Sequence, residues 1–272
     1  MNSNQLSDHI AATYQALRIG LAIIAFVFPP LLVVGGMIFD KVAWQESMSA
    51  YYHASPKSQE VALQKDAAQV DTANDASKPP LHSQGTMRNW FVGLLFGVGT
   101  ILFLYKGFTW LENWALNIAG VMAWGVALFP MPWDGFRAIP VPFLGPKCHL
   151  HFACAITLFI CIAYVCIYRA ADTLPLIKDE ARKDRYRKCY RVLGHLMWLF
   201  PAIAWLVSST LTQHRYLVFL MEMLGVWIFA AYWWVKSREI AETNADKKAL
   251  YGQLKVPNHT AAHFNKAIPI TD

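Results

Sequence analysis

The sequence predicts an all-α fold, a polytopic membrane helix bundle of six transmembrane helices with both termini in the cytoplasm. Hydrophobic residues make up 56% of the 272 positions and charged residues only 15%, whereas soluble domains carry about 25% charged residues. Several uncharged runs also reach the roughly 20 residues that a helix needs to cross the hydrocarbon of a bilayer. Helices are the expected elements, because an open sheet edge leaves backbone groups unsatisfied in lipid.

Uncharged stretches between charged residues define six expected spans. The first contains Pro29 and Pro30, which should kink it. The second is short and is expected to borrow a turn from its flanks, and Gly93, Gly97 and Gly99 give it a small-residue face for close helix packing. The expected spans are 19–39, 90–105, 113–130, 148–168, 192–211 and 216–235.

The distribution of lysine and arginine predicts the orientation. The termini, the 106–112 turn and the 169–191 loop together hold 16 of the 24 basic residues, and the other side holds eight. The 169–191 loop alone contains eight of them, whereas the 131–147 loop contains two. Because cytoplasmic loops carry the excess of lysine and arginine, both termini are expected in the cytoplasm. The interleaved acids of the basic loop indicate a solvated helix near anionic headgroups, and no nucleic-acid partner is expected.

The chain divides into four segments. The N-terminal segment, first span and outer motif occupy 1–53, and a flexible extracytoplasmic insertion is expected at 54–87. The remaining five spans occupy 88–236, and 237–272 forms a cytoplasmic tail with a short helix expected within it. The insertion has almost no large apolar residues, so it cannot bury enough surface to order itself strongly.

Most residues able to do chemistry fall on the outer face of this topology. They include SMSAYYH at 47–53, PWDGF at 132–136 and CHLH at 148–151. Glu222 lies inside the sixth span, roughly 9 Å from its outer end at 1.5 Å per residue. A carboxylate at that depth should be protonated, paired or facing a polar cavity, and Arg88 is a candidate partner. A functional role and a buried pair that fixes helix packing both fit this position.

These residues predict an outward-facing polar pocket that binds a lipid headgroup or small polar ligand. Its expected members are Ser49, Tyr51, Tyr52, His53, Arg88, His151 and Glu222. No CxxC occurs, and the histidine pair at i, i+4, His259 and His263, lies in the expected tail away from the other candidates, so no cofactor is expected. Zinc is the alternative, with His53, Asp134, His149 and His151 as candidate ligands.

Several motifs in order resemble an uncharacterised group of bacterial six-span proteins, which is similar to Frag/DRAM-like membrane proteins. They are SMSAYYH, MRNWFVGLLFGVGTILFLYKG, NIAGVMAWGVALFP, HFACAITLF and a glutamate followed by VWIFAAYWWVK. The resemblance covers nearly all of spans two to six and implies a multi-pass protein of the inner (plasma) membrane. It also marks residues 54–86 as an insertion peculiar to this chain.

A more distant likeness is to the ceramidase and adiponectin-receptor superfamily of zinc-dependent membrane hydrolases. Ser49 and His53 match the first element of that site. The sixth span lacks the late HxxxH of that site and has Glu222 instead, and the HTAAH at 259–263 falls in the expected cytoplasmic tail.

Three functions therefore stay open. The preferred one is binding of a lipid headgroup or small polar ligand, with membrane lipids as the partner. The first alternative is a metal-dependent lipid amidase or esterase using Ser49 with the candidate zinc ligands. The second is a transporter or an immunity-like protein whose outer surface docks another protein.

Overall fold

The fold is helical throughout the part of the chain that the structure describes. This computed structural model describes residues 3–54, 85–133, 138–142, 148–210, 216–251 and 253. Extended pairing in these ranges is confined to an isolated bridge between Pro140 and His149, so the all-α prediction is confirmed for them. The long helices are α1 (Ser3–Gly35), α3 (Thr86–Leu104), α4 (Trp110–Leu128), α5 (Leu150–Tyr164), α6 (Glu180–Thr210) and α7 (Leu217–Thr243).

Four helical stretches among the described residues are long and apolar enough to cross a membrane. They are Gln5–Asp40, Thr86–Leu104, Leu150–Leu176 and Leu217–Thr243. They coincide with the first, second, fourth and sixth expected spans and support a membrane protein. The helices α4 and α6 are not among the four. α4 carries Glu112, Asn113 and Asn117, and α6 begins with the basic run of the sequence.

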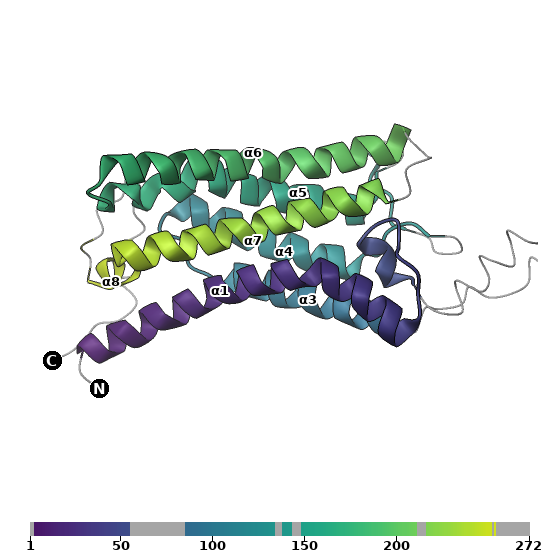
Figure 1. Cartoon of the computed structure of the whole chain (residues 1–272), viewed down its shortest axis with the longest axis horizontal. Coiled ribbons are helices and arrows are strands. Elements are labelled where there is room, and N and C mark those ends of the chain that lie inside the picture. The colour runs from purple at the N-terminus through teal and green to yellow at the C-terminus, as the bar shows by residue number, and fades with distance from the viewer. Residues whose placement is uncertain are drawn as a thin grey trace, which may run out of the picture.

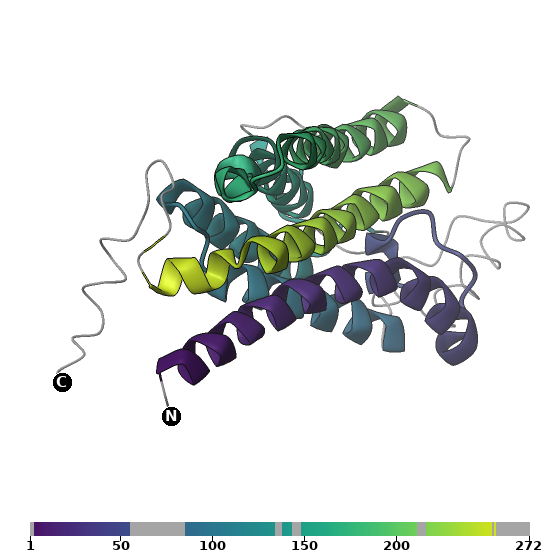
Figure 2. The same ribbon diagram turned by 60° about the vertical axis from the view of Figure 1, so that its left-hand side comes forward.

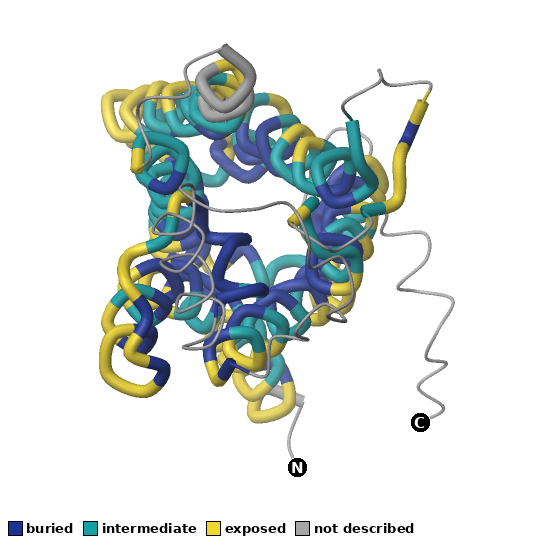
Figure 3. The backbone as a smooth tube through the Cα atoms, turned by 90° about the vertical axis from the view of Figure 1, so that its right-hand side faces the viewer, coloured by how far each residue is buried: buried dark blue, intermediate teal, exposed yellow. Residues whose placement is uncertain are grey.

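Helices that follow one another in the chain are neighbours in space. α1 packs on α3, α3 on α4, α4 on α5, α5 on α6 and α6 on α7, and α7 returns to pack on α1. Figures 1 and 2 show the chain reversing direction between long helices, and Figure 3 shows the helices arranged around a common axis. We call the end that holds residues 41–54 and 129–133 the motif end. The opposite end holds the short helix α8 (Ala245–Leu250) and is called the terminal end.

The helices extend beyond most of the uncharged runs that predict them. α3 begins at Thr86, which gives the short second span its expected extra turn. α6 begins at Glu180, so the basic run forms the first turns of a helix that continues into the bundle. α1 runs through Pro29 and Pro30, and Figure 1 shows it bending in its second half, as prolines inside a helix cause.

Close packing between α3 and α4 depends on one glycine from each helix. A Cβ added to Gly99 would lie 2.8 Å from the carbonyl oxygen of Gly120, and a Cβ on Gly120 would lie 2.6 Å from that of Gly99. Gly93 and Gly97 have no such neighbour within 4 Å. The small-residue face predicted for α3 is therefore wrong for two of its three glycines, because only Gly99 faces another backbone.

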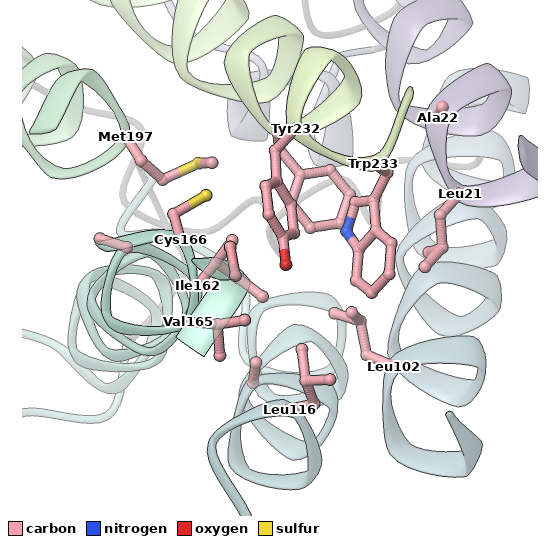
Figure 4. Close-up of a cluster of buried hydrophobic side chains, with 14 of the residues drawn as sticks. Leu21, Ala22, Leu102, Leu116, Ile162, Val165, Cys166, Met197, Tyr232 and Trp233 are labelled. Atoms are coloured by element: carbon pink, nitrogen blue, oxygen red, sulfur yellow. The ribbon is translucent and has the colours of Figure 1, made fainter. Parts of the chain in front are cut away.

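Two hydrophobic clusters fill the ring of helices. The cluster in the terminal half contains Tyr232 and Trp233 of α7, and Figure 4 shows both side chains directed between the surrounding helices. The cluster in the motif half contains Phe28, Phe91 and Phe219. Apolar faces of the helices therefore meet along the axis, as the layers of a single core do.

The insertion expected at 54–87 lies mostly outside the described residues, but its two described ends meet. A Cβ added to Gly85 would lie 2.4 Å from the carbonyl oxygen of Ala54. The chain thus leaves and re-enters the bundle at one place on the motif end. At the terminal end, α7 continues to Thr243, Asn244 turns with φ 52°, and α8 forms the short tail helix that the sequence predicts.

Candidate functional site

The 41–54 segment folds over the motif end and is held there by α7. Glu222 accepts a 2.6 Å hydrogen bond from the backbone N–H of Met48, and Phe219 N–H donates to the carbonyl oxygen of Glu46 at 3.0 Å. Residues Ser49–Tyr52 then form a 3-10 turn, labelled η2. The Glu222 carboxylate is therefore paired, and its partner is a backbone amide of the motif.

Asp40 joins this segment to α3. Its carboxylate accepts hydrogen bonds from the backbone N–H groups of Thr86 (3.1 Å) and Met87 (2.8 Å), and the residue is buried. A carboxylate at this position satisfies two amides that lack partners within the helix, and it interacts favourably with the helix dipole. Asp40 is not among the predicted site residues, although an acidic residue directly after a long apolar run is a visible signal in the sequence.

Ser49 and His53 lie against the same residue of the 129–133 segment. The Ser49 hydroxyl donates to Met131 Sδ at 3.2 Å, and the Met131 carbonyl accepts from His53 Nε2 at 3.1 Å. The His53 ring also stacks on Trp133, with 5.2 Å between centroids and 16° between planes. The serine and histidine thus share a face, as their spacing predicts, and both side chains are buried.

Arg88 and Tyr52 form the half-buried edge of the cluster. The guanidinium donates to the Tyr52 hydroxyl at 2.9 Å and lies over the Tyr52 ring, 4.6 Å from its centroid. The neighbouring Tyr51 points the other way, into the core. Its hydroxyl accepts from the Gln45 N–H at 3.4 Å, its ring contacts Phe219, and burial raises the pKa of the phenol.

The electrostatic character of the cluster comes from a neutral histidine beside a charged arginine. Burial is the main cause that lowers the pKa of His53 below its ordinary value, and the positive charge of Arg88 lowers that pKa further. The hydrogen bond to Met131 acts in the opposite direction. The imidazole is therefore neutral at pH 7, and Arg88 supplies the positive charge of this edge.

The two histidines of the CHLH motif take different positions. His149 precedes α5 in an extended conformation, and its buried Nδ1 has no hydrogen-bond partner among the described residues. His151 lies in the first turn of α5, with Nδ1 2.8 Å from the carbonyl oxygen of Phe129. Among described residues, no group of three or more His, Cys, Asp or Glu is placed to hold a metal ion. Asp134 lies outside the described residues, so the zinc alternative stays a prediction.

The structure brings all seven predicted site residues to the motif end, but they do not all contact one another. Tyr52 contacts both His53 and Arg88, and Ser49 lies with His53 against Met131. Tyr51 and Glu222 lie on the α7 side, and His151 binds the carbonyl of residue 129. Among the described residues, direct contacts between members of the set join Tyr52 to His53 and to Arg88.

A second polar cluster, which the sequence analysis missed, lies inside the terminal end. Lys236 donates to Glu239 (2.7 Å), Thr173 (2.7 Å) and the carbonyl of Ala170 (2.8 Å), and Tyr190 donates to Glu239 at 3.1 Å. These bonds join α7 to α6 and to the helical extension of α5. A lysine and a glutamate three residues apart at the end of an apolar run are the available signal in the sequence.

Arg18 forms a third such link. It is fully buried and donates to Asp246 at 2.6 and 3.2 Å and to the Tyr105 hydroxyl at 3.2 Å. The bidentate pair ties α1 to α8, 228 positions apart in the chain. Both terminal-end clusters are internally paired, so they serve first as cross-links between helices.

Scans of the chain against protein-family models, curated proteins and solved structures find no match.

Proposed function

We propose that the protein crosses the inner (plasma) membrane six times, with both termini in the cytoplasm, and binds a lipid headgroup or small polar ligand at the motif end. The six-span count is supported by the order of helices in the ring. α4 lies between α3 and α5, and α6 lies between α5 and α7. If α3, α5 and α7 cross the bilayer, the antiparallel helices packed between them cross it too. α4 has 19 residues, about 28 Å at 1.5 Å per residue, which matches the hydrocarbon thickness.

The orientation is supported by the position of the basic residues. Arg182, Lys183, Arg185, Arg187 and Lys188 all belong to the first turns of α6, which begin at the terminal end. Positive charge of this density is typical of the cytoplasmic side of a membrane protein. The motif end then faces the extracytoplasmic side.

The Arg88–Tyr52 pair is the observation that carries ligand binding. The guanidinium is held by a hydrogen bond and a ring, and both residues are half-buried at the rim of the motif end. Trp44, Trp90 and Trp133 are each more than a third exposed at this same end, as tryptophans at the level of lipid headgroups are. A guanidinium carries a fixed positive charge and several N–H donors in one plane, which suit a phosphate or carboxylate group.

The buried part of the cluster supports this edge. Ser49 and His53 hold the 3-10 turn against Met131, and Glu222 holds the start of the motif through Met48. These contacts fix the turn that carries Tyr52. The expected ligand is therefore an anionic or zwitterionic headgroup whose phosphate lies over Arg88.

Soluble headgroups test this proposal without interference from lipid tails. Glycerol 3-phosphate and phosphoethanolamine are titrated into the detergent-solubilised full chain by calorimetry. At least one should bind, and Arg88→Gln should weaken binding roughly tenfold, because a charge-assisted hydrogen bond is lost. The matched control Lys106→Gln removes a positive charge beyond the other end of α3 and should leave the affinity unchanged. Equal binding by Arg88→Gln, or binding of neither headgroup to the unmodified protein, would contradict the proposal.

A further inference from the structure

A groove of about 540 Å³ lies at the terminal end, on the outside of the ring. Its walls are Gln15 and Ile19 of α1 and Tyr186 of α6, and its floor is the outward face of α7 from Trp234 to Glu242. α7 packs against both α1 and α6. The groove therefore follows α7 between its two neighbours and faces the surroundings of the bundle.

The groove carries one unpaired positive charge. Glu242 is engaged by Arg182 and by the Tyr186 hydroxyl, the latter at 3.2 Å. Arg238 is exposed on the groove floor and makes no hydrogen bond or ion pair with any described residue. Because the carboxylate is already neutralised by Arg182, the free guanidinium of Arg238 makes the groove attractive to an anion.

A row of apolar side chains on α1 extends from the groove toward the middle of the bundle. Ile19 is followed at helical spacing by Ile23 and Phe26, whose side chains are more than half exposed. The Phe26 ring stacks on Trp227 of α7, with 5.5 Å between centroids. Trp234 is also half exposed beside the charged end. Along this surface the positive charge of Arg238 comes first, the Trp234 ring lies beside it, and the apolar row from Ile19 to Phe26 follows. A phospholipid has its charged headgroup, its interfacial region and its acyl chains in the same order.

We infer that this groove is a binding site for one anionic phospholipid of the leaflet at the terminal end. The lipid phosphate is bound by Arg238, and an acyl chain lies along Ile19, Ile23 and Phe26. A soluble anion matches only the charged half of the surface. This site lies at the opposite end from the Arg88 cluster and requires only that the bundle is embedded in a membrane.

Native mass spectrometry of the full chain, with phosphatidylglycerol or phosphatidylcholine added to the detergent, tests the inference. The protein should retain phosphatidylglycerol in preference to phosphatidylcholine. Arg238→Gln should lower that retention about fivefold, from the roughly 1 kcal/mol that one basic residue contributes near an anionic membrane surface. The matched control Arg185→Gln removes an exposed charge on α6 outside the groove and should retain the lipid as the unmodified protein does.

A second variant separates occupancy of the groove from charge. Ala241 is exposed on the groove floor, so Ala241→Trp fills the space and leaves every charge in place. It should also lose phosphatidylglycerol. Undiminished retention by either Arg238→Gln or Ala241→Trp would overturn the inference, as would equal competition by inorganic phosphate, which would show an anion site without a lipid chain. Loss of headgroup binding at Arg88 would leave these outcomes unaffected.

Discussion

Asp40 and Asp179 show how one residue type has a different effect in different surroundings. Asp40 accepts from two amides at the start of α3 and is buried, whereas Asp179 accepts from the amides of Ala181 and Arg182 at the start of α6 and is exposed. Water can hydrogen-bond to the α6 amides in place of the Asp179 carboxylate, but it reaches the buried amides beside Asp40 poorly. The burial of Asp40 follows from the packing of the motif segment on α3, which is a tertiary contact.

Asp40→Ala is therefore expected to lower the free energy of unfolding in mixed micelles by about 1–2 kcal/mol, the usual effect of removing a helix cap. Asp179→Ala is the matched control and should lower it less. Equal losses for the two variants would show that burial of the Asp40 carboxylate has no effect on stability.

His53 makes stability depend on pH. Burial and the Arg88 charge lower its pKa in the folded protein below the 6.5 of the free side chain. The folded state therefore binds fewer protons than the unfolded state in this range. The stability that neutral His53 contributes is complete above about pH 6.5 and is lost as the pH falls from there through the folded pKa.

We expect the unfolding temperature to fall between pH 7.5 and pH 5.5, and to fall less steeply for His53→Gln, which cannot be protonated. Thermal unfolding of both proteins in the same detergent at several pH values measures the difference. Parallel curves for the two proteins would show that His53 does not titrate in this interval.

At the scale of elements, the contact between α3 and α4 depends on Gly99 and Gly120. A side chain at Gly120 meets the backbone of α3, whereas one at Gly97 meets open space. Gly120→Val is therefore expected to lower the free energy of unfolding by about 1–3 kcal/mol through overpacking. Gly97→Val should have little effect, so a comparison of the two in mixed micelles separates packing from helix propensity. Similar losses would argue against a close approach of the two helices.

Hydrophobic run length predicts the number of long helices but not where each one begins. α6 begins at Glu180, well before its uncharged run, because the basic turns form intrahelical ion pairs such as Lys183–Glu180 and Arg187–Asp184. These first turns carry charged side chains, so they add residues to the helix without lengthening the apolar run from which the helix was predicted. The contact between Gly99 and α4 could not be predicted either, since the spacing of the three α3 glycines does not say which of them lies against another helix.

For the whole molecule, cysteine labelling tests both the number of spans and their direction. Single cysteines are placed in a chain whose five native cysteines are replaced. An impermeant maleimide added to intact cells should label Ser77→Cys, in the expected extracytoplasmic insertion, and a restored Cys148, at the motif end. It should not label Lys106→Cys or Lys178→Cys until the membrane is permeabilised. Labelling of positions 106 and 148 from the same side would show that α4 does not cross, and protection of position 77 would invert the orientation.

The sequence alone determined the class of environment, the helical fold and the basic side of the bundle. These properties follow from local quantities, namely the length of apolar runs against bilayer thickness and the count of charges between them. It also placed the candidate site residues at one end, because the helices alternate in direction and bring 47–53 and 148–151 to the same side. It did not reveal which of those residues are neighbours.

Only the tertiary structure decided the pairings, because they join residues far apart in the chain. Glu222 meets the amide of Met48 across 174 positions, and Arg18 meets Asp246 across 228. Nothing in the local sequence distinguishes these partners from others at the same depth. The packing of α7 against α1 and α6 sets them in place, and the same packing creates the groove beside Arg238.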